Sequence, residues 1–260
     1  MSDVTSCTTD SGIGYIRMNR HTALNALSVS QVQLITKAMK QLVEDSGVRV
    51  IVISSTVLNA FSVGADLKER LELDSRAMME ARGSSVAMTC ALLDVEVPTI
   101  AAVHGLALGG GLELALTCDL LIADRTASFG LPETGIGIIP GGGGTQLLPR
   151  KIGSGRAKEL IMTGRRIDAD EAYRYGVVDV LAPGGVSAAG HADAVAITIA
   201  AKSATAQRNA KAALRGSQYL TLADGLALED QLWRVSAVTP DYREGLAAFS
   251  QRRPVAWPQP

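Results

Sequence analysis

The sequence predicts an α/β protein, and three observations lead to that class. Short β-branched runs alternate with helical segments as far as about Gly153, the order expected of parallel strands joined by right-handed helical crossovers. After Gly153 the chain is predicted to be almost entirely helical. The 260 residues are 47% hydrophobic, which is enough for the sizeable core of a single α/β domain.

Four strands are predicted in the first part of the chain. Residues 13–19 (IGYIRMN) alternate between apolar and polar side chains, as in a strand with one buried face. Residues 48–55 (VRVIVISS) and 98–105 (PTIAAVHG) are nearly continuous apolar runs, which indicates strands buried on both faces. Residues 118–124 (CDLLIAD) give the fourth strand.

Helices are predicted between these strands. The first covers residues 27–47, with Ser28 or Ser30 as its N-cap and Gly47 as its end. Its apolar face is expected to contain Val32, Ile35, Met39, Leu42 and Val43. Residues 75–95 predict a second helix, and the glycines at 109–111 lead into a short third one.

The last third of the chain is predicted to form successive helices, with a loop at residues 182–190. The final helix begins at Thr239-Pro240, where threonine caps it and proline takes the first helical position. The others are expected at residues 154–164, 168–176, 190–202, 204–216 and 221–238.

Charge and cysteine content exclude several functional classes. The 25 basic and 26 acidic residues nearly balance, which argues against nucleic acid as the main ligand. The three cysteines, Cys7, Cys90 and Cys118, are odd in number and far apart, so neither a metal site nor a disulfide framework is expected. The N-terminal residues show no signal-peptide pattern and no run is long enough to span a membrane, so we expect a cytoplasmic protein without a membrane partner.

Three familiar motifs can be set aside. PGGGGTQ at residues 140–146 lacks the lysine and hydroxyl residue that must follow the last glycine of a phosphate-binding loop. No dinucleotide-binding glycine fingerprint opens the first helix, and no nucleophile elbow is present. His21, His104 and His191 are isolated; we expect a structural role for His104, with a proton shuttle as the alternative.

One carboxylate stands out in LALGGGLELALTCD, residues 106–119. Gly109–Gly111 follow a predicted strand and precede a short helix, and amides at a helix N-terminus have no intrahelical partners. Without Cβ atoms, these glycines would let a ligand oxygen reach the backbone, an arrangement suited to a developing oxyanion. Glu113 would lie about one turn further into the helix, although a tight turn and a helix-dipole acid explain the same residues.

Two further segments bear on that interpretation. Glu133, between Pro132 and Thr134, is an ordinary turn acid if taken alone, but two carboxylates at one oxyanion site would form an acid–base pair. In NAFSVGADLKER, residues 59–70, a glycine before Ala65 and Asp66 offers a second exposed amide, although an ordinary loop into a helix is the simpler interpretation.

Taken together, these motifs resemble the crotonase family, the enoyl-CoA hydratases and isomerases. The resemblance covers nearly the whole chain and is closest to the methylglutaconyl-CoA hydratases. The stretches that carry it are MNRHTALNALS, FSVGADLKE, VPTIAAVHGLALGGGLELALTCDLLIA, FGLPETGIGIIPGGGGTQLLPRKIG, AKELIMTGRRIDADEAYRYGVVD and EGLAAFSQRRP.

The resemblance implies a fold that the residue patterns alone do not predict. It is a spiral of ββα turns, here residues 1–195, followed by a C-terminal helical region, residues 196–260, that forms a homotrimer or a homohexamer of two trimers. His21 stands where many members of the family have proline, near the turn that binds adenine.

The resemblance also assigns roles to individual residues. Glu113 and Glu133 match the catalytic carboxylates, and the amides of Ala65 and Gly110 match the oxyanion hole for the thioester carbonyl. Substrate or CoA binding is implied for Ala65, Asp66, Leu67, Lys68, Gly110, Phe249 and Arg252, the last two often reaching a neighbouring subunit's site. No metal or other cofactor is implied, because coenzyme A is part of the substrate.

The activity that follows is hydration of a 2-enoyl-CoA, such as those of fatty-acid β-oxidation or branched-chain amino-acid catabolism. A Δ3,Δ2-enoyl-CoA isomerase is the alternative, but family isomerases often keep only the carboxylate at the position of Glu133. An RNA-binding relative is the non-enzyme alternative. The matching helix offers only Lys37 and Lys40 against Glu44 and Asp45, which is little charge for phosphate contacts.

Overall fold

The computed structural model describes residues 3–9 and 11–258, so Met1, Ser2 and Asp10 of the N-terminal stretch considered above lie outside it. A six-stranded sheet runs through the molecule in the order β1-β2-β3-β5-β7-β10. β1 pairs antiparallel with β2, and every other pairing in this sheet is parallel. The strands are β1 (Val4–Thr8), β2 (Ile13–Met18), β3 (Val50–Ser55), β5 (Thr99–Val103), β7 (Leu120–Ala123) and β10 (Val180–Leu181).

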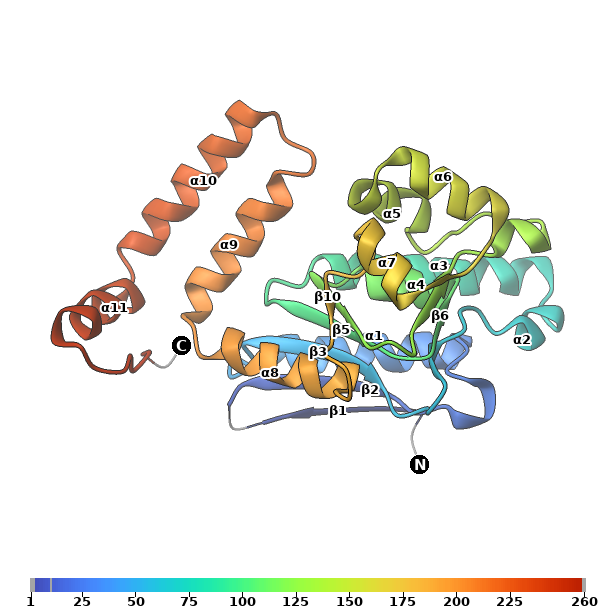
Figure 1. Ribbon diagram of the computed structural model, residues 1–260, viewed down its shortest axis with the longest axis horizontal. Coiled ribbons are helices and arrows are strands. Elements are labelled where there is room, and N and C mark those ends of the chain that lie inside the picture. Colours follow the sequence, from blue (N-terminus) through green and yellow to red (C-terminus); the bar gives the residue numbers. More distant parts are fainter. Residues whose placement is uncertain (1–2, 10, 259–260) are drawn as a thin grey trace.

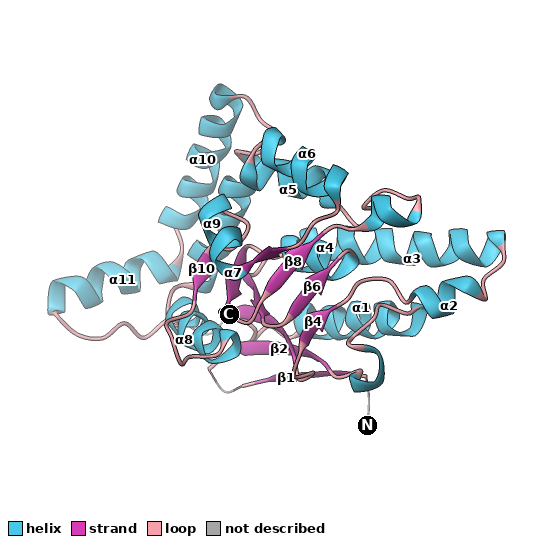
Figure 2. Ribbon diagram, turned by 45° about the vertical axis from the view of Figure 1, so that its right-hand side comes forward, coloured by secondary structure: helices cyan, strands magenta, loops and turns pink. Residues whose placement is uncertain are grey.

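A second, smaller sheet has the order β4-β6-β8-β9. Its members are β4 (Ala60–Ser62), β6 (Leu106–Leu108), β8 (Ser128–Gly130) and β9 (Ile167–Asp168). β4, β6 and β8 each follow a strand of the large sheet directly, so every turn of the chain contributes one strand to each sheet before a helical segment returns. This repeat is the ββα spiral of the predicted fold class, and Figure 2 shows the two sets of strands with helices around them.

The helices are α1 (Val29–Glu44), α2 (Leu67–Leu71), α3 (Ser75–Leu93), α4 (Gly110–Leu116), α5 (Gly144–Ile152), α6 (Ser154–Thr163), α7 (Ala169–Tyr175), α8 (Ala188–Ala200), α9 (Ala204–Gly216), α10 (Leu222–Ala237) and α11 (Pro240–Gln251). Two 3-10 turns, η1 (His21–Ala23) and η2 (Glu133–Ile136), complete the elements. Among the elements missed in the sequence are β1, the small sheet and α5.

The first helix needs two corrections. Ser28 is its N-cap, accepting a hydrogen bond from the Gln31 amide, but α1 ends at Glu44 rather than at Gly47. Val43 is 51% exposed, although Ile35 and Leu42 are buried. At about 100° per residue, Val43 lies roughly 80° from the centre of the buried arc, so it stands at the margin of the apolar face.

The core fills both faces of the large sheet. One cluster joins residues of α1, α3 and α4 to residues of both sheets, with Phe61 and Phe129 fully buried in it. The other lies under α8, whose alanines at 188, 192, 196 and 200 face the β-branched side chains of β3, β5 and β7. Small side chains at every fourth position let this helix approach the sheet closely.

Helices α9, α10 and α11 form a C-terminal arm that projects from the sheet, in orange and red in Figure 1. Of the arm's residues only Gly216 and Ala248 are buried. α8 begins at Ala188, inside the loop expected at residues 182–190. The domain boundary expected between residues 195 and 196 lies in the middle of this helix. Ala196 and Ala200 still pack on the sheet, so the chain leaves the core after α8.

Candidate active site

A glycine turn positions Glu113 where β6 meets α4. Gly109 has φ +52, a conformation that favours glycine, and its amide donates to the Gly130 carbonyl (2.8 Å). Gly111 packs so close to β4 that a Cβ atom there would lie 2.2 Å from the Ser62 carbonyl oxygen. The turn therefore requires glycine at both positions, and it leaves Glu113 in the first turn of α4, 4% exposed.

The amides of Ala65 and Gly110 lie beside each other. A Cβ atom built on Gly110 would be 3.7 Å from the Ala65 nitrogen, and one built on Gly64 would be 2.9 Å from the Gly110 nitrogen. The hydrogen bonds of residues 3–9 and 11–258 leave both N–H groups without an acceptor. The structure thus brings together the two donors predicted for an oxyanion, in two residues that are each partly exposed.

The Glu113 carboxylate is held by the glycine loop that precedes α5. Its Oε1 accepts hydrogen bonds from the amides of Gly142 (2.7 Å) and Gly144 (2.8 Å). Gly144 is the first residue of α5, so the positive end of that helix faces the carboxylate. Burial raises the pKa of Glu113, while the two amides and the charges of Arg82 and Arg70 oppose the rise.

Glu133 opens η2 in a different environment. Its carboxylate lies against Gly109, where a Cβ atom would be 2.9 Å from Oε1. Oε2 is buried and finds no hydrogen-bond partner among the described residues. Burial, together with the charge of Glu113, raises the pKa of Glu133 to about 7. The two glutamates therefore share one site, but Glu113 accepts from two amides of a distant loop, whereas the backbone amide that acts on Glu133 is its own.

The segment proposed for CoA binding starts with a carboxylate that the fold itself uses. Asp66 caps α2 through hydrogen bonds from the Lys68 and Glu69 amides and pairs with Arg20 at 2.7 Å. Burial alone would raise the pKa of Asp66, but the Arg20 hydrogen bond and these amides outweigh it and lower the pKa. Leu67 and Lys68 are exposed, so their side chains are available to a ligand.

Phe249 and Arg252 lie far from the two glutamates within one chain. Both belong to the end of α11, at the opposite side of the molecule from α2 and α3 (Figure 1). Phe249 is 86% exposed and Arg252 is also exposed. Within one chain they cannot contact a ligand at the two glutamates. Their predicted roles in substrate binding therefore require that the chain forms an oligomer.

The two histidines nearest the predicted motifs have local partners. The His104 Nε2 atom lies 2.8 Å from the Val57 carbonyl oxygen, which agrees with a structural role. His21 is the first residue of η1, and its Nε2 atom lies 2.8 Å from Asn19 Oδ1.

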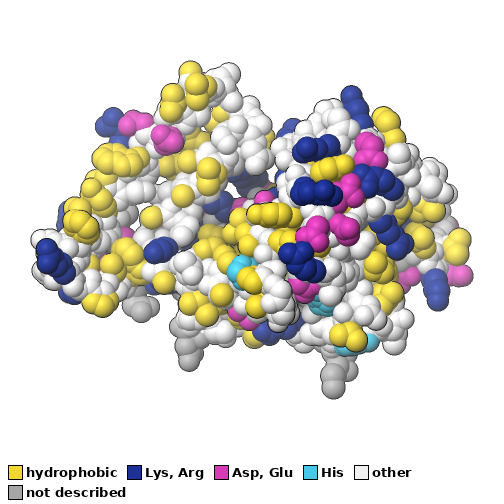
Figure 3. Space-filling model, viewed as in Figure 1, with side chains coloured by type: hydrophobic (Ala, Val, Ile, Leu, Met, Phe, Trp, Pro, Cys, Tyr) yellow, Lys and Arg dark blue, Asp and Glu magenta, His cyan; other side chains and the backbone are white. Residues whose placement is uncertain are grey.

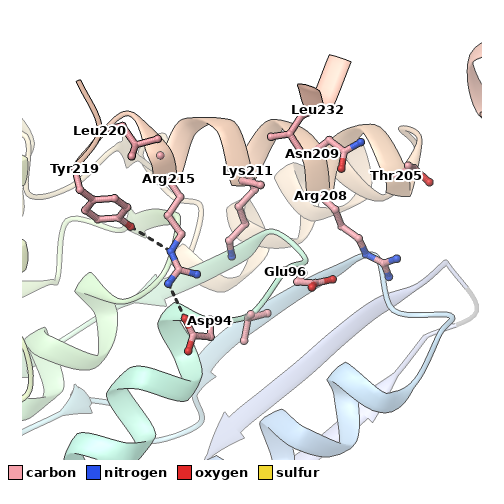
Figure 4. A pocket seen from close by; sticks show the side chains of 13 residues that line it. Asp94, Glu96, Thr205, Arg208, Asn209, Lys211, Arg215, Tyr219, Leu220 and Leu232 are labelled. Carbon is pink, nitrogen blue, oxygen red and sulfur yellow. Dashed lines mark hydrogen bonds and ion pairs between the residues drawn. The ribbon is translucent and has the colours of Figure 1, made fainter. Parts of the chain in front are cut away.

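A separate cavity of about 590 Å³ lies between α9 and the end of α3 (Figure 4). Arg208, Lys211 and Arg215 extend from α9 toward it, and no residue of the glutamate site lines it. Arg215 is paired with Asp94 (2.6 Å) and Lys211 with Asp119 (2.7 Å). These ion pairs connect α9 to the end of α3 and to Asp119, so they hold the arm against the core. We therefore take the site of the two glutamates, and not this cavity, as the candidate active site.

The hydrogen bonds from the Gly142 and Gly144 amides to Glu113 were not predicted from the sequence. The segment PGGGGTQ does contain these glycines, but its local pattern does not indicate a contact with Glu113, which lies about thirty residues earlier. Arg70 and Arg82, whose charges reach the glutamates, were not predicted either. Nothing in their local sequence distinguishes them from other helix-surface arginines.

Two buried or partly buried carboxylates beside two free backbone amides, on a ββα spiral, form an arrangement that is chemically suited to acid–base catalysis on a carbonyl compound. The family model described as enoyl-CoA hydratase/isomerase matches residues 8–260. The chain belongs to this family, the crotonases.

Individual relatives agree along almost the whole chain. YngF of Bacillus subtilis, which carries an enoyl-CoA hydratase/isomerase name, is 45% identical over 240 residues, 92% of this chain and 91% of that protein. Human mitochondrial methylglutaconyl-CoA hydratase is 41% identical over 246 residues, 94% of this chain and 73% of that protein. The crystal structure of an enoyl-CoA hydratase from Bacillus anthracis has a TM-score of 0.95 and 38% identity, covering 98% of this chain and 99% of that one.

Proposed function

We propose that this enzyme is an enoyl-CoA hydratase, which adds water across the 2,3 double bond of a 2-enoyl-CoA thioester. The observation that carries the proposal is the pairing of Glu113 and Glu133 at one pair of free amides, in two different environments. Hydration needs one group to take a proton from water and another to give a proton to carbon, and the difference between the glutamates suits that division.

The amides of Ala65 and Gly110 bind the thioester oxygen in this mechanism. Their hydrogen bonds polarise the carbonyl and stabilise the enolate that forms when oxygen adds to C3. A donor of this kind typically contributes ~3 kcal/mol to the transition state. Both amides follow glycines that pack closely against neighbouring backbone, which favours donors that are in place before the reaction.

Glu113 is the base and Glu133 the acid. Two amide donors favour the ionised form of Glu113 and fix its orientation, so it accepts a proton from water as the water oxygen bonds to C3. Glu133, with a pKa of about 7, delivers its proton to C2. The proton then returns from Glu113 to Glu133 through solvent, so that one water is added and both glutamates are restored.

An isomerase is the second candidate, because the family includes both activities in its description. The experiment is to incubate a 2-enoyl-CoA and a 3-enoyl-CoA separately with the enzyme in H2(18O) and follow both products by mass spectrometry. We expect the 2-enoyl substrate to gain labelled oxygen. Reaction of the 3-enoyl substrate alone, without label, would replace the hydratase proposal with the isomerase.

We further propose that the enzyme assembles as a homotrimer or as a homohexamer of two trimers. The support is the C-terminal arm, where large apolar side chains lie along α10 and α11 on the surface (Figure 3). They include Leu222, Leu226, Trp233, Val235, Val238, Leu246 and Phe249. Light scattering after size-exclusion chromatography tests this, and a monomer at micromolar concentration would contradict it.

Other expectations remain predictions. These are 3-methylglutaconyl-CoA as a substrate, a role in fatty-acid or branched-chain amino-acid breakdown, independence of any metal or added cofactor, and a cytoplasmic location. In residues 3–9 and 11–258, no helix is long and apolar enough to cross a membrane.

A further inference from the structure

The loop that holds the Glu113 carboxylate consists of four successive glycines, residues 141–144. The amides of Gly142 and Gly144 are its donors to that carboxylate. Glycine has more backbone freedom than any other residue, so such a loop needs outside contacts before it can keep another group in one place. Among the described residues, the side chains that form hydrogen bonds with the backbone of this loop are those of Glu113 and Thr89. Thr89 of α3 is therefore the candidate anchor.

Thr89 contacts the loop at the peptide unit that lies between the two donors. Its Oγ1 donates to the Gly142 carbonyl oxygen at 3.2 Å, and this carbonyl belongs to the peptide unit that joins Gly142 to Gly143. The two amides that donate to Glu113 belong to the peptide units on either side of it. Because each unit is planar, fixing the middle one restricts how the other two can rotate relative to each other. The Thr89 methyl carbon also lies only 3.6 Å from the Cβ position of Gly143.

The Thr89 hydroxyl is shared between this loop and its own helix. It has a second acceptor, the Ser85 carbonyl oxygen one turn earlier in α3, also at 3.2 Å. Three other helical threonines donate only to the preceding turn, and their bonds are shorter: Thr36 (2.8 Å), Thr163 (2.7 Å) and Thr198 (3.0 Å). A longer bond is expected where one proton serves two acceptors. The distances thus indicate that the contact with the loop draws the hydroxyl away from its helix.

α3 meets the glycine loop at a second point on the same helix face. Arg82 precedes Thr89 by seven residues, close to two full turns, so the two side chains leave α3 in nearly the same direction. A Cβ atom on Gly141 would lie 3.3 Å from the Arg82 guanidinium carbon, so the guanidinium rests against that backbone. Arg82 makes no hydrogen bond to the loop among the described residues, which leaves the directional contact to Thr89.

We propose that Thr89 is a positioning residue for Glu113: by holding the peptide unit between Gly142 and Gly143, it keeps both amide donors directed at the carboxylate. Its effect on catalysis rests on the proposed hydratase activity, in which Glu113 takes a proton from water. Without the hydroxyl, the loop can leave this arrangement, and the carboxylate loses its fixed orientation toward the water. Substrate binding should change little, because the oxyanion amides and the segment proposed for CoA binding belong to other parts of the chain.

The test uses three variants. Thr89→Val removes the hydroxyl but keeps the shape of the side chain, and Thr89→Ser keeps the hydroxyl. Thr36→Val is the matched control, because Thr36 is also a half-buried helical threonine but donates only within its own helix, to Val32. Hydrogen exchange, measured by mass spectrometry on peptides that contain residues 141–144, reports on the two amides without requiring activity. We expect faster exchange in Thr89→Val alone.

The kinetic test measures kcat and KM with crotonyl-CoA and 3-methylglutaconyl-CoA and uses the faster substrate. We expect Thr89→Val to lower kcat about five- to tenfold with little change in KM, in line with the loss of one hydrogen bond that positions a catalytic group. Thr89→Ser should restore most of the wild-type kcat, and Thr36→Val should match the wild type. A structural defect that merely reduced the amount of folded enzyme would not be accompanied by a changed pH profile.

The pH profile of kcat/KM supplies that second readout. The amide donors lower the pKa of Glu113, so a looser loop lets this pKa rise, and activity should begin to fall at a higher pH on the acid side in Thr89→Val. The other charged side chains that act on Glu113 are Glu133 of η2, Arg82 of α3 and Arg70 of α2, and all three are the same in every variant.

The possible outcomes separate this inference from the proposed function. Unchanged exchange in Thr89→Val, or an equal change in Thr36→Val, would overturn the inference whether or not the enzyme hydrates either substrate. Faster exchange with unchanged kcat and an unchanged pH profile would also overturn it, because the contact would then be structural only. If the wild type hydrates neither thioester, the proposed function fails, while the exchange data still decide whether Thr89 holds the loop.

Discussion

The core around α4 and the C-terminal arm use large apolar side chains in opposite ways. In the core, Phe61 and Phe129 are fully buried, and the backbone around them is fixed closely enough to align two amides and two carboxylates. On the arm, Trp233 is 64% exposed and Phe249 is 86% exposed. The two glutamates and the two amides are therefore brought together within one chain, whereas the arm has an apolar surface that only another molecule can cover.

The largest effect should come from the glutamates themselves. Glu113→Gln and Glu133→Gln should each lower kcat for a 2-enoyl-CoA by about 10² or more, because each loses one proton transfer. Circular dichroism and assembly size should not change, since the arm is untouched. Glu229→Gln, an exposed position on α10, is the control, and near-normal hydration by either site variant would refute the assignment.

The next largest effect should come from disturbing the hydrogen bonds that the glycine loop donates to Glu113. A Cβ atom on Gly142 would lie 2.7 Å from the Glu113 Oε2 atom, so Gly142→Ala must displace the carboxylate or the loop. We expect kcat to fall about tenfold or more, because small displacements of a catalytic group are costly. Gly135→Ala is the matched control, as no atom lies within 4 Å of its Cβ position. Equal kcat values for the two variants would show that the position of the Glu113 carboxylate against this loop does not affect the reaction.

The pH dependence separates the two glutamates. If Glu133 must be protonated, kcat/KM for hydration should fall above pH 7, by about fivefold between pH 7 and pH 8, as expected for one group with a pKa of about 7. A pH profile that stays flat over this range would contradict Glu133 as the acid.

The same shift predicts a change in stability. The pKa of Glu133 is raised from 4.5 to about 7, so the native state holds the proton more tightly than the unfolded chain. Its contribution to the free energy of unfolding is therefore complete below about pH 4.5 and is lost as pH rises through 7. Denaturant unfolding at pH 5 and pH 8 should show a larger loss for the wild type than for Glu133→Gln. A loss of the same size in both proteins would show that another group is responsible.

The smallest effect concerns the arm. Trp233→Ser should weaken self-association roughly three- to fivefold, the range expected for one apolar side chain at an interface, while hardly changing the unfolding of the dissociated chain. Sedimentation over a dilution series measures the first and denaturant unfolding at low concentration the second. Leu58→Ser replaces an apolar side chain that lies outside the arm and is 83% exposed, and it should leave association unchanged. If both substitutions weaken it equally, the arm is not the distinguishing surface.

Much of the architecture was predictable from local patterns. The β-branched runs correspond to β3 and β5, and the late helices match closely. Thr239 caps the last helix as predicted, and Ser28, one of the two candidates, caps the first. The strands of the small sheet were missed because β4, β6 and β8 have only three residues each, too few to show a period. The second strand of each ββα turn was therefore implied by the family resemblance and not by the residue pattern.

The candidate residues can be recognised from the amino-acid order: a glutamate after three glycines, a second one after Pro132, and two glycine turns whose amides were expected to be exposed. The environments of these residues depend on how the chain folds. Gly142 and Gly144 reach Glu113 from a distant loop, while no donor reaches the buried oxygen of Glu133. The reason is physical: a pKa depends on burial and on neighbouring dipoles and charges, and these are set by segments that meet only when the chain folds.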